Sequence, residues 1–480
     1  MPEKLLRFTT VEQAYPDKRE ALERARDFLE IARPYAAEKA AEQSSRCSQC
    51  GVPFCQVHCP LGNHIPDWLR LTAEGRVREA YELSAATSSM PEICGRICPQ
   101  DRLCEGSCVI EQSGHGAVTI GSIEKYLTDR AWEEGWVEPL VPGRPTGRSV
   151  GIIGAGPAGL TAAEGLRELG HEVVVYDRWD RPGGLLMYGI PGFKLEKDVV
   201  ARRTDRLAAA GVSFRLNTDV GRDIAFGELR ARHDALLVAT GVHAARELDR
   251  PAPARGVVAA MDFLTAATKV GFGEAPEGFT SGALDAAGRD VVVIGGGDTA
   301  MDCVRTAIRQ GARSVTCLYR RDRANMPGSQ REVGHAEEEG VRFEWLAAPA
   351  GFETGPDGAV SAVLAQRMRL GAPDAIGRRS VSPAPEPPAR LPAQLVIKAL
   401  GYDAEDLEAA WGAGLATTRW GTLKVGRDFA TNVPGVFAVG DIVRGASLVV
   451  WAVRDGRDAV APIHAWLRQP ARAAVAAAAA

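Results

Sequence analysis

The alternation of hydrophobic and polar residues divides the chain into two regions of different periodicity. Up to about residue 140, apolar residues recur at helical spacing with few β-branched positions, as in "REALERARDFLEIARPYAAEKAAEQ" and "DWLRLTAEGRVREAYELSAAT". Beyond it, "SVGIIGAGPAGLTAAEGLRELGHEVVVYD" has the order strand, glycine turn, helix, strand. The same order recurs at "RDVVVIGGGDTAMDCVRTAIRQGARSVTCLYRR". The pattern therefore predicts an α/β protein with a helical N-terminal region and two βαβ units.

Composition and charge exclude several classes of protein. The apolar fraction of 45% and the charged fraction of 25% are ordinary for a globular chain. A formal charge of −4 provides no basic field for nucleic acid. The first residues lack the continuous apolar segment of a signal peptide, and no run of about 18 apolar residues occurs. We therefore expect a cytoplasmic protein with no nucleic-acid or membrane partner.

The first βαβ unit carries a turn with the spacing G-x-G-x-x-G. Gly154, Gly156 and Gly159 follow an apolar strand and open an alanine-rich helix. Glycines so spaced allow a tight turn, a close approach of the backbone to a pyrophosphate, and close packing of helix on strand. The helix N-terminus favours the anionic phosphates. Asp177 ends the next strand, where a carboxylate accepts hydrogen bonds from ribose hydroxyls, so this unit predicts a dinucleotide site.

The second unit differs from the first at the end of its second strand, where a dinucleotide site distinguishes NADPH from NADH. Gly295, Gly297 and Ala300 give G-x-G-x-x-A, and Arg320 and Arg321 stand where the first unit has its aspartate. Guanidinium groups hold a 2′-phosphate through charge-assisted hydrogen bonds, whereas a carboxylate repels it. The second unit therefore predicts a preference for NADPH over NADH; a solvated charge run at a strand end is the alternative interpretation.

Eight of the ten cysteines are crowded into two short stretches with the spacings C-x2-C-x4-C-x3-C and C-x3-C-x5-C-x3-C. Because cytosolic thiols stay reduced, such crowding indicates metal ligands before disulfides. Two 4Fe-4S clusters and two four-thiolate zinc sites are the candidates, and prolines directly after two of the cysteines are typical of cluster ligands. The candidate ligands are Cys47, Cys50, Cys55, Cys59, Cys94, Cys98, Cys104 and Cys108. The remaining two, Cys303 and Cys317, lie in apolar segments and are expected to be buried packing residues.

The order of motifs GAGPAG, GGL–GIP, ATG, GGGDTAMD and FAVGD resembles the flavoprotein oxidoreductases with two dinucleotide-binding domains. The resemblance implies FAD on the first unit and NADPH on a second unit inserted in the first. It implies FAD-site residues Gly154, Gly156, Gly159, Asp177, Gly184, Leu185, Thr240, Gly440 and Asp441. It implies NADPH-site residues Gly295, Gly297, Asp298, Thr299, Arg320 and Arg321.

These assignments divide the chain. The expected parts are a helical iron–sulfur domain (1–140), a Pro/Gly-rich linker (141–149), an FAD-binding domain in two parts (150–285 and 401–468), an NADPH-binding domain between them (286–400), and a flexible tail (469–480).

Many members of that family pass electrons to a cysteine pair beside the flavin, and this chain departs from the pattern. Between Gly154 and Asp441 the only cysteines are Cys303 and Cys317, which are separated by thirteen residues inside the second unit. Electrons must therefore leave the flavin by another route. Zinc does not accept electrons, so two 4Fe-4S clusters are favoured over zinc at the N-terminal cysteines.

Together the two regions resemble the small-subunit family of bacterial NADPH-dependent glutamate synthases and the N-terminal half of dihydropyrimidine dehydrogenase. The resemblance extends through "RCSQCGVPFCQVHCPLGNHIPDW" and "YRRDRANMPGS". In this group the ligands interleave, which implies one cluster held by Cys47, Cys50, Cys55 and Cys108 and another held by Cys59, Cys98 and Cys104 with a fourth ligand.

The fourth ligand of the second cluster stays open between two residues. The dehydrogenase has a glutamine where this chain has Glu124, in "TIGSIEKYL". Either Glu124 completes the set, with Cys94 a neighbouring thiol, or Cys94 is itself the ligand.

The resemblance implies an electron-input subunit. NADPH would reduce FAD by hydride transfer, which needs no catalytic acid or base from the protein, and electrons would pass through the clusters to a large (α) partner subunit carrying FMN that forms L-glutamate from glutamine and 2-oxoglutarate. The alternatives are an electron-transfer subunit that serves ferredoxin, sulfide or pyrimidine reduction, and a zinc-stabilised binding module on an inactive flavoprotein scaffold.

Overall fold

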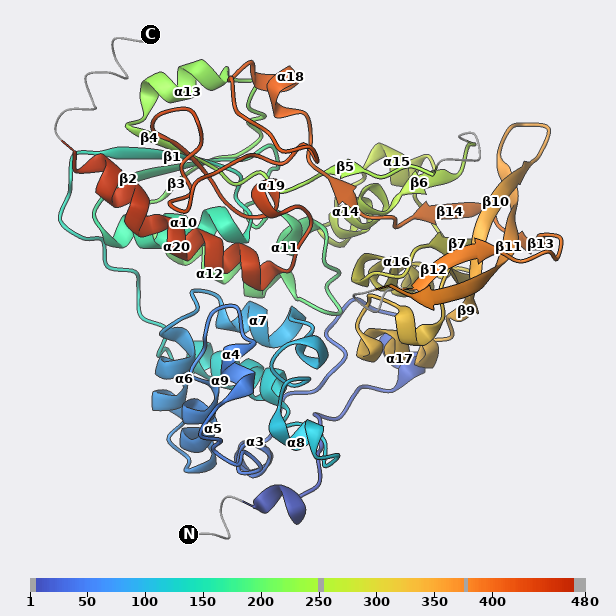
Figure 1. Cartoon of the computed structure of the whole chain (residues 1–480), viewed down its shortest axis with the longest axis horizontal. Coiled ribbons are helices and arrows are strands. Elements are labelled where there is room, and N and C mark those ends of the chain that lie inside the picture. Colours follow the sequence, from blue (N-terminus) through green and yellow to red (C-terminus); the bar gives the residue numbers. More distant parts are fainter. Residues whose placement is uncertain (1–5, 249–253, 375–378, 470–480) are drawn as a thin grey trace.

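The computed structural model describes residues 6–248, 254–374 and 379–469 in three regions (Figure 1). The helical N-terminal region lies against two α/β regions, each built on its own sheet. The expected tail lies almost wholly outside the described residues. The structure confirms the predicted fold class: a helical domain followed by two Rossmann-like domains, the second inserted in the first.

Short helices make up the N-terminal region. They pack around Trp68, Leu69 and Ile123, which are fully buried, and the Trp68 indole donates to Asn63 Oδ1 at 2.7 Å. A break at Gly75, where φ is +76°, separates α5 from α6. The helices are η1 Arg7–Thr9, α2 Ala21–Arg24, α3 Ala37–Ser44, α4 Phe54–Val57, α5 Ile65–Ala73, α6 Val77–Ala85, α7 Pro91–Ile97, η2 Gln100–Arg102, α8 Val109–Gln112 and α9 Ile120–Glu133.

Residues 25–36 are not helical, although their apolar spacing predicted a helix. Pro34 disfavours helical geometry at Arg33, and backbone hydrogen bonds instead pair residues 31–33 with residues 17–19. Lys18 pairs with Ala32 in an isolated antiparallel bridge, and Phe28 contacts the Phe193 ring at 6.2 Å between centroids. Residues 17–33, here named the strap, thus form a loop that includes α2, closes on itself through this bridge and contacts the α/β regions.

The first α/β region is a five-stranded parallel sheet in the order β16-β4-β1-β2-β3. Strand β16 returns from far along the chain to pair with β4, with Val436 opposite Leu236. Helix α20 packs directly on α10, because Gly456 lets the two backbones approach: a Cβ there would lie 2.3 Å from the Ala158 carbonyl oxygen. The elements are β1 Ser149–Ile153, α10 Pro157–Glu168, β2 Glu172–Tyr176, α11 Leu185–Tyr188, α12 Lys197–Ala209, β3 Ser213–Arg215, α13 Phe226–Arg232, β4 Ala235–Val238, β16 Val436–Ala438, α19 Asp441–Arg444 and α20 Val449–Leu467.

The second α/β region is a parallel sheet in the order β6-β14-β7-β8-β9, inserted between β4 and β16. Its edge strand β6 comes from before residue 286, where the sequence pattern placed the start of this domain. The elements are β6 Val257–Ala259, α14 Ala260–Gly271, α15 Glu277–Thr280, β7 Asp290–Ile294, α16 Asp298–Arg309, β8 Ser314–Tyr319, η3 Arg323–Asn325, α17 Gln330–Glu338, β9 Arg342–Trp345 and β14 Leu395–Lys398.

Smaller elements complete the second region. An antiparallel sheet projects from it (Figure 1), and a two-stranded ribbon of β5 and β15 forms where the chain passes between the sheets. The elements are β10 Ala347–Thr354, β11 Val360–Pro373, β12 Arg379–Pro383, β13 Ala389–Pro392, β5 Ala244–Ala245, β15 Tyr402–Asp403 and α18 Leu407–Trp411.

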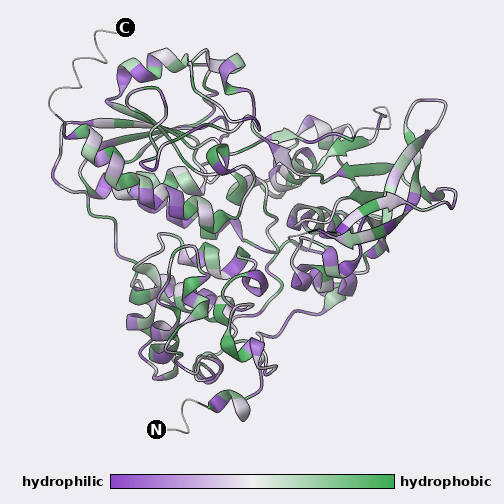
Figure 2. Ribbon diagram, in the orientation of Figure 1, coloured by the Kyte–Doolittle hydropathy of each residue, from purple (hydrophilic) through white to green (hydrophobic). Residues whose placement is uncertain are grey.

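Apolar residues concentrate in the strands and on the inner faces of the helices, as Figure 2 shows. Cys303 and Cys317 are fully buried in the core of the second sheet, as expected. Among the described residues, no helix combines the length and apolar character needed to cross a membrane.

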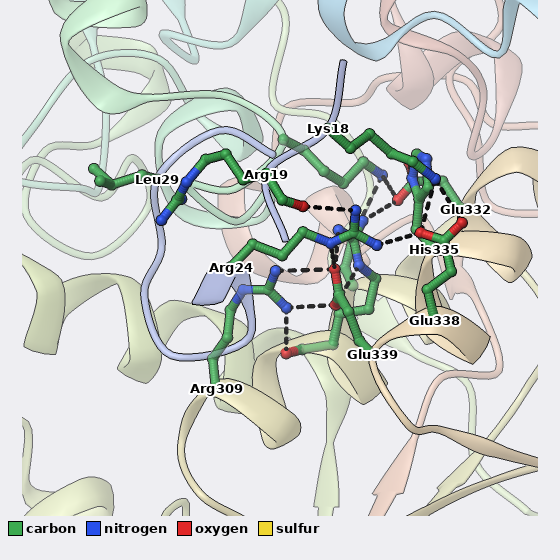
Figure 3. A network of polar contacts seen from close by, with 12 residues as sticks. Lys18, Arg19, Arg24, Leu29, Arg309, Glu332, His335, Glu338 and Glu339 are labelled. Atoms are coloured by element: carbon green, nitrogen blue, oxygen red, sulfur yellow. Dashed lines mark hydrogen bonds and ion pairs between the residues drawn. The ribbon is translucent and has the colours of Figure 1, made fainter. Parts of the chain in front are cut away.

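A buried charge network joins the strap to the inserted domain (Figure 3). Glu339 accepts hydrogen bonds from Arg24 of the strap and from Arg305 and Arg309 of α16, and its side chain is fully buried. Burial would raise the pKa of Glu339, but hydrogen bonds from Arg309 and Arg305 outweigh burial and hold the pKa at about 2. Neighbouring Glu338 pairs with Arg24 and Lys18. The network ties α16 and α17 to the N-terminal region.

Candidate functional site

A cavity of about 380 Å³ opens at the carboxyl ends of the first sheet's strands. Its wall is built from turns that follow β1, β2, β4 and β16, so residues far apart in the sequence meet there. Of the predicted FAD-site residues, the cavity is lined by Gly154, Gly156, Asp177, Gly184, Leu185, Thr240, Gly440 and Asp441.

The three glycines of the first turn have different geometric roles. Gly154 has a φ of +110°, and a Cβ there would lie 2.3 Å from the Ala239 carbonyl oxygen. A Cβ at Gly159 would lie 2.1 Å from the Gly154 carbonyl oxygen, so this glycine serves helix–strand packing outside the cavity. At Gly156 a Cβ would meet no atom within 4 Å, and the backbone there is open to the cavity. That open cradle at the N-terminus of α10 fits a pyrophosphate.

Asp177 is anchored to the glycine turn. One carboxylate oxygen accepts from the Ala155 backbone N–H at 2.6 Å and the other from the Trp179 backbone N–H at 2.9 Å. Burial raises the pKa of this carboxyl. Each oxygen keeps a second lone pair, so the carboxylate fits the expected ribose contact while it also shapes the turn.

The opposite wall of the cavity follows β16. Gly440 has a φ of +74°, and Asp441 accepts a hydrogen bond from Ser447 Oγ at 2.5 Å. Burial raises the pKa of Asp441. Helix α20 begins beside this turn, with Leu448 and Val449 in the cavity wall.

Several residues that line the cavity were not predicted from the sequence. Arg178 directly follows Asp177 and pairs with Glu405 at 2.7 Å, and Trp179 and His243 also line the cavity. Their positions just after β2 and β4 are a local signal that could have identified Arg178, Trp179 and His243. Glu405 carries no such signal, because only the return of the chain from the inserted domain brings it there.

The second glycine turn repeats the geometry of the first. A Cβ at Gly295 would lie 2.2 Å from the Ala399 carbonyl oxygen, whereas Gly297, at the start of α16, has open space where its Cβ would be. Asp298 is the first residue of α16, Thr299 follows it, and Asp298 Oδ1 accepts from the Ser329 backbone N–H at 2.9 Å. The open turn at a helix N-terminus again fits a dinucleotide pyrophosphate.

Arg320 and Arg321 lie directly after β8, beside this turn. Arg320 is exposed, and Arg321 Nε donates to the Arg379 carbonyl oxygen at 3.1 Å. Among the described residues, neither has a carboxylate partner, whereas Arg323 pairs with Glu337 at 2.8 Å. The two guanidinium groups therefore remain available to an anionic ligand.

The thiols fall into two sets, and the first surrounds a small apolar cavity in the helical region. Leu69, Val118 and Ile120 complete its wall. Burial raises the pKa of Cys47 to about 11 and that of Cys55 to about 12. The thiols of this first set are Cys47, Cys50, Cys55 and Cys108.

The second set lies closer to the first α/β region. Cys94 is buried in the same hydrophobic core as β1 and α10, and Cys59 and Cys98 pack against that core. A hydrogen bond with Cys94, together with burial, raises the pKa of Cys98, and burial and Glu105 raise the pKa of Cys104. Burial raises the pKa of Cys59 to about 11, and Glu124 and Cys94 are among the groups that act on it.

Both candidates for the fourth ligand border this second set. Glu124 is buried, accepts from Ser84 Oγ at 3.3 Å, and burial raises its pKa to about 8. Cys94 lies on α7, which crosses α9 at Gly95: a Cβ there would lie 2.7 Å from the Lys125 backbone nitrogen. The close crossing brings Cys94, Cys98 and Glu124 together.

The donor sets fit thiolate-bound iron–sulfur clusters in chemistry and in grouping. Within residues 6–248, 254–374 and 379–469, no three His, Cys, Asp or Glu side chains are arranged to hold a single metal ion. The first set instead borders a shared cavity, which is the arrangement a multi-atom cluster needs.

Two family models match the chain. Residues 24–136 match the dihydropyrimidine dehydrogenase domain II, 4Fe-4S cluster family. Residues 148–456 match the pyridine nucleotide-disulphide oxidoreductase family.

Curated relatives match over nearly the whole length. The chain is 62% identical to the glutamate synthase (NADPH) small chain of Azospirillum brasilense, covering 99% of each. It is 46% identical to that of Escherichia coli (strain K12), covering 97% of this chain and 100% of the relative.

Among solved structures, Mycobacterium tuberculosis FprA in complex with NADPH superposes with a TM-score of 0.57 at 22% identity. The match covers 70% of this chain and 89% of FprA, a likeness of fold.

Proposed function

The chain belongs to the small-chain family of NADPH-dependent glutamate synthases and is an oxidoreductase, and from that premise we propose that it is the cytoplasmic electron-input subunit of such an enzyme. In this proposal it oxidises NADPH and delivers electrons to a large partner subunit carrying FMN, which makes L-glutamate from glutamine and 2-oxoglutarate. When bound, NADPH supplies a hydride, FAD accepts its two electrons and releases them one at a time, and two 4Fe-4S clusters carry single electrons.

The position of the second thiol set is the observation that carries the proposal. Cys94, Cys59 and Cys98 share one hydrophobic core with the sheet whose cavity we assign to FAD. Cys303 and Cys317, in contrast, are buried in the core of the other sheet. The thiols of the helical region therefore offer the route by which electrons leave the flavin domain.

We assign the cavity residues and the first glycine turn to FAD, and the second turn with Arg320 and Arg321 to NADPH. The two open glycine cradles support two dinucleotides rather than one. Arginines that have no carboxylate partner among the described residues support recognition of the 2′-phosphate of NADPH.

The first thiol set supports an exit toward the partner, because exposed Phe54 and Val109 belong to the wall of its cavity. Four apolar side chains beside it are exposed, and they are here named the exit patch: Val52, Phe54, Val57 and Val109. An exposed apolar patch is typical of a protein–protein contact. We propose that the large subunit covers it, because electrons from the adjacent site require an acceptor there.

An anaerobic co-purification tests the function. The protein would be isolated from its native cells, its partner identified by mass, and NADPH oxidation measured with glutamine plus 2-oxoglutarate. We expect one large partner and oxidation that requires both substrates. NADPH-dependent dye reduction without that requirement would contradict the glutamate synthase assignment.

The same assay tests a second candidate function. Escherichia coli (strain K12) AegA, named as an oxidoreductase, is 45% identical over 94% of this chain, and the match covers 69% of AegA. The same architecture therefore also occurs within a longer protein of another name, which favours an electron-transfer subunit for a different acceptor, such as ferredoxin, sulfide or a pyrimidine, as the alternative.

A further inference from the structure

The segment between two candidate cluster ligands, Cys98 and Cys104, reaches out of the helical domain and contacts the second glycine turn. It contains η2, which ends at Arg102. Arg102 Nη1 donates to the Pro327 carbonyl oxygen at 2.5 Å, and Nη2 donates to Asp298 Oδ2 at 3.3 Å. A cation of the iron–sulfur domain thus lies at the N-terminus of α16.

The segment is held in place by other contacts. Asp101 Oδ2 accepts from Ser329 Oγ at 3.1 Å and from the Gln330 backbone N–H at 3.2 Å. Glu105, which is buried, accepts from Arg331 at 2.7 Å. Arg102 is therefore held in position by Asp101 on one side and by Glu105, just beyond the segment, on the other.

The loop that receives these contacts, residues 327–329, packs against the second glycine turn. The Gly328 backbone N–H donates to the Gly296 carbonyl oxygen at 2.9 Å. A Cβ at Gly328 would lie 3.1 Å from that oxygen, so the loop packs directly on the turn. Pro327 and Ser329, which flank Gly328, carry the contact to the helical domain.

The chemistry of Arg102 suits an additional anion. Its guanidinium has five N–H donors, of which the two contacts above use two, and its side chain is 42% exposed. Asp298 places a negative charge at the helix N-terminus, where it would repel a phosphate unless a cation balances it. Gly297, beside Asp298, leaves the adjacent space open.

We propose that Arg102 binds the pyrophosphate of NADPH directly, so that the iron–sulfur domain completes the nucleotide site of the inserted domain. The inference rests on the proposed assignment of NADPH to this turn, and it is independent of the partner and of glutamate. It makes NADPH binding depend on the docking of the segment that carries two cluster ligands.

Equilibrium binding to the cluster-loaded protein tests the proposal. NADP⁺ and 2′-AMP, which has the 2′-phosphate but no pyrophosphate, would be titrated by calorimetry into wild type and Arg102→Ala. We expect Arg102→Ala to bind NADP⁺ about ten- to a hundredfold more weakly than wild type, because a charge-assisted hydrogen bond is lost. The variant should bind 2′-AMP within about twofold of wild type. Arg320→Ala should instead weaken both ligands.

Matched variants keep the result interpretable. Arg130→Ala removes an exposed arginine of the same domain that pairs with Glu133 and Glu134, and it should change neither affinity. Arg102→Lys keeps the charge and should recover part of the NADP⁺ affinity. If Arg102→Ala loses iron, Arg102→Lys replaces it as the test, because lysine preserves most of the bulk of the side chain.

Three results would overturn the proposal: NADP⁺ affinity unchanged in Arg102→Ala, equal weakening of 2′-AMP, or loss of the effect in an Asp298→Asn background. The last would mean that Arg102 only neutralises Asp298. Failure of wild type to bind NADP⁺ would instead contradict the NADPH assignment itself.

Discussion

Glycine meets two separate requirements in the two glycine turns. Gly154 and Gly295 have positive φ and lie against backbone carbonyl oxygens, so a side chain at either would strain the fold. Gly156 and Gly297 have ordinary backbone geometry and open space beside them. Only the second pair is free to be replaced without disturbing the protein itself.

This difference predicts opposite outcomes for two alanine variants. Gly156→Ala should fold normally and lose bound flavin, because its methyl group enters the space of the pyrophosphate. Gly154→Ala should lower stability by about 2 kcal/mol, because its methyl group meets the Ala239 carbonyl oxygen. Flavin absorbance per chain and thermal unfolding measure the two effects. Full flavin content in Gly156→Ala would contradict the FAD assignment of this turn.

At the scale of elements, the crossing of α7 on α9 assembles the second thiol set. Gly95 and Gly121 lie at this contact, and a Cβ at Gly121 would lie 2.3 Å from Gln100 Nε2. The crossing leaves both Cys94 and Glu124 beside the set, so local geometry permits either as the fourth ligand.

We predict that Glu124 is the ligand. Glu124→Ala should lower the iron and labile sulfide content by about half, whereas Cys94→Ser should leave both unchanged. Glu133→Ala, on the exposed face of the same helix, is the matched control. The reverse pattern, with iron lost in Cys94→Ser alone, would identify Cys94.

The buried carboxylate after α17 gives a prediction about stability and pH. Glu339→Gln should lower stability by about 3 kcal/mol, because it leaves Arg24, Arg305 and Arg309 without their shared anion. The folded pKa of about 2 lies below the ordinary value of 4.5, so the stabilisation is complete above pH 4.5 and is lost only as the pH falls toward 2.

Hydrogen exchange of α17 amides would measure this effect between pH 5 and 8, where the difference between wild type and Glu339→Gln should stay constant. Glu337→Gln, which alters an exposed pair with Arg323, should cost less than about 1 kcal/mol. A difference that changes across this pH range would contradict the assigned charge state.

At the scale of the whole molecule, the two thiol sets have different surroundings. One shares its core with the first sheet, and the other borders the exit patch, where Val57 is 65% and Phe54 is 46% exposed. In the proposed function, this arrangement directs electrons from the cavity outward to the large subunit.

Charges on the exit patch should separate the internal reaction from transfer to the partner. Phe54→Asp and Val57→Asp should leave NADPH-dependent dye reduction within about twofold of wild type and lower glutamate formation with the large subunit at least tenfold. Trp420→Asp, at an exposed residue in the distant α18–β16 connection, is the control. Equal glutamate formation in all variants would exclude the patch as the contact.

Local patterns in the sequence determined the glycine turns, the basic residues after β8, the spacing of the thiols and the α/β class. Each depends on residues within one turn, strand or helix, whose periodicity follows from backbone geometry. The interleaving of the ligand sets was not local, and it came from family resemblance rather than from spacing.

Only the tertiary structure decided which distant segments meet. It left residues 25–36 without helix, brought Glu405 to Arg178, and set Arg102 against Asp298. Such contacts depend on how whole elements pack, and packing is a property of many residues at once that no single stretch encodes. Short motifs therefore identify the residues that bear the chemistry, whereas the fold determines how the two glycine turns, the cavity and the two thiol sets are joined.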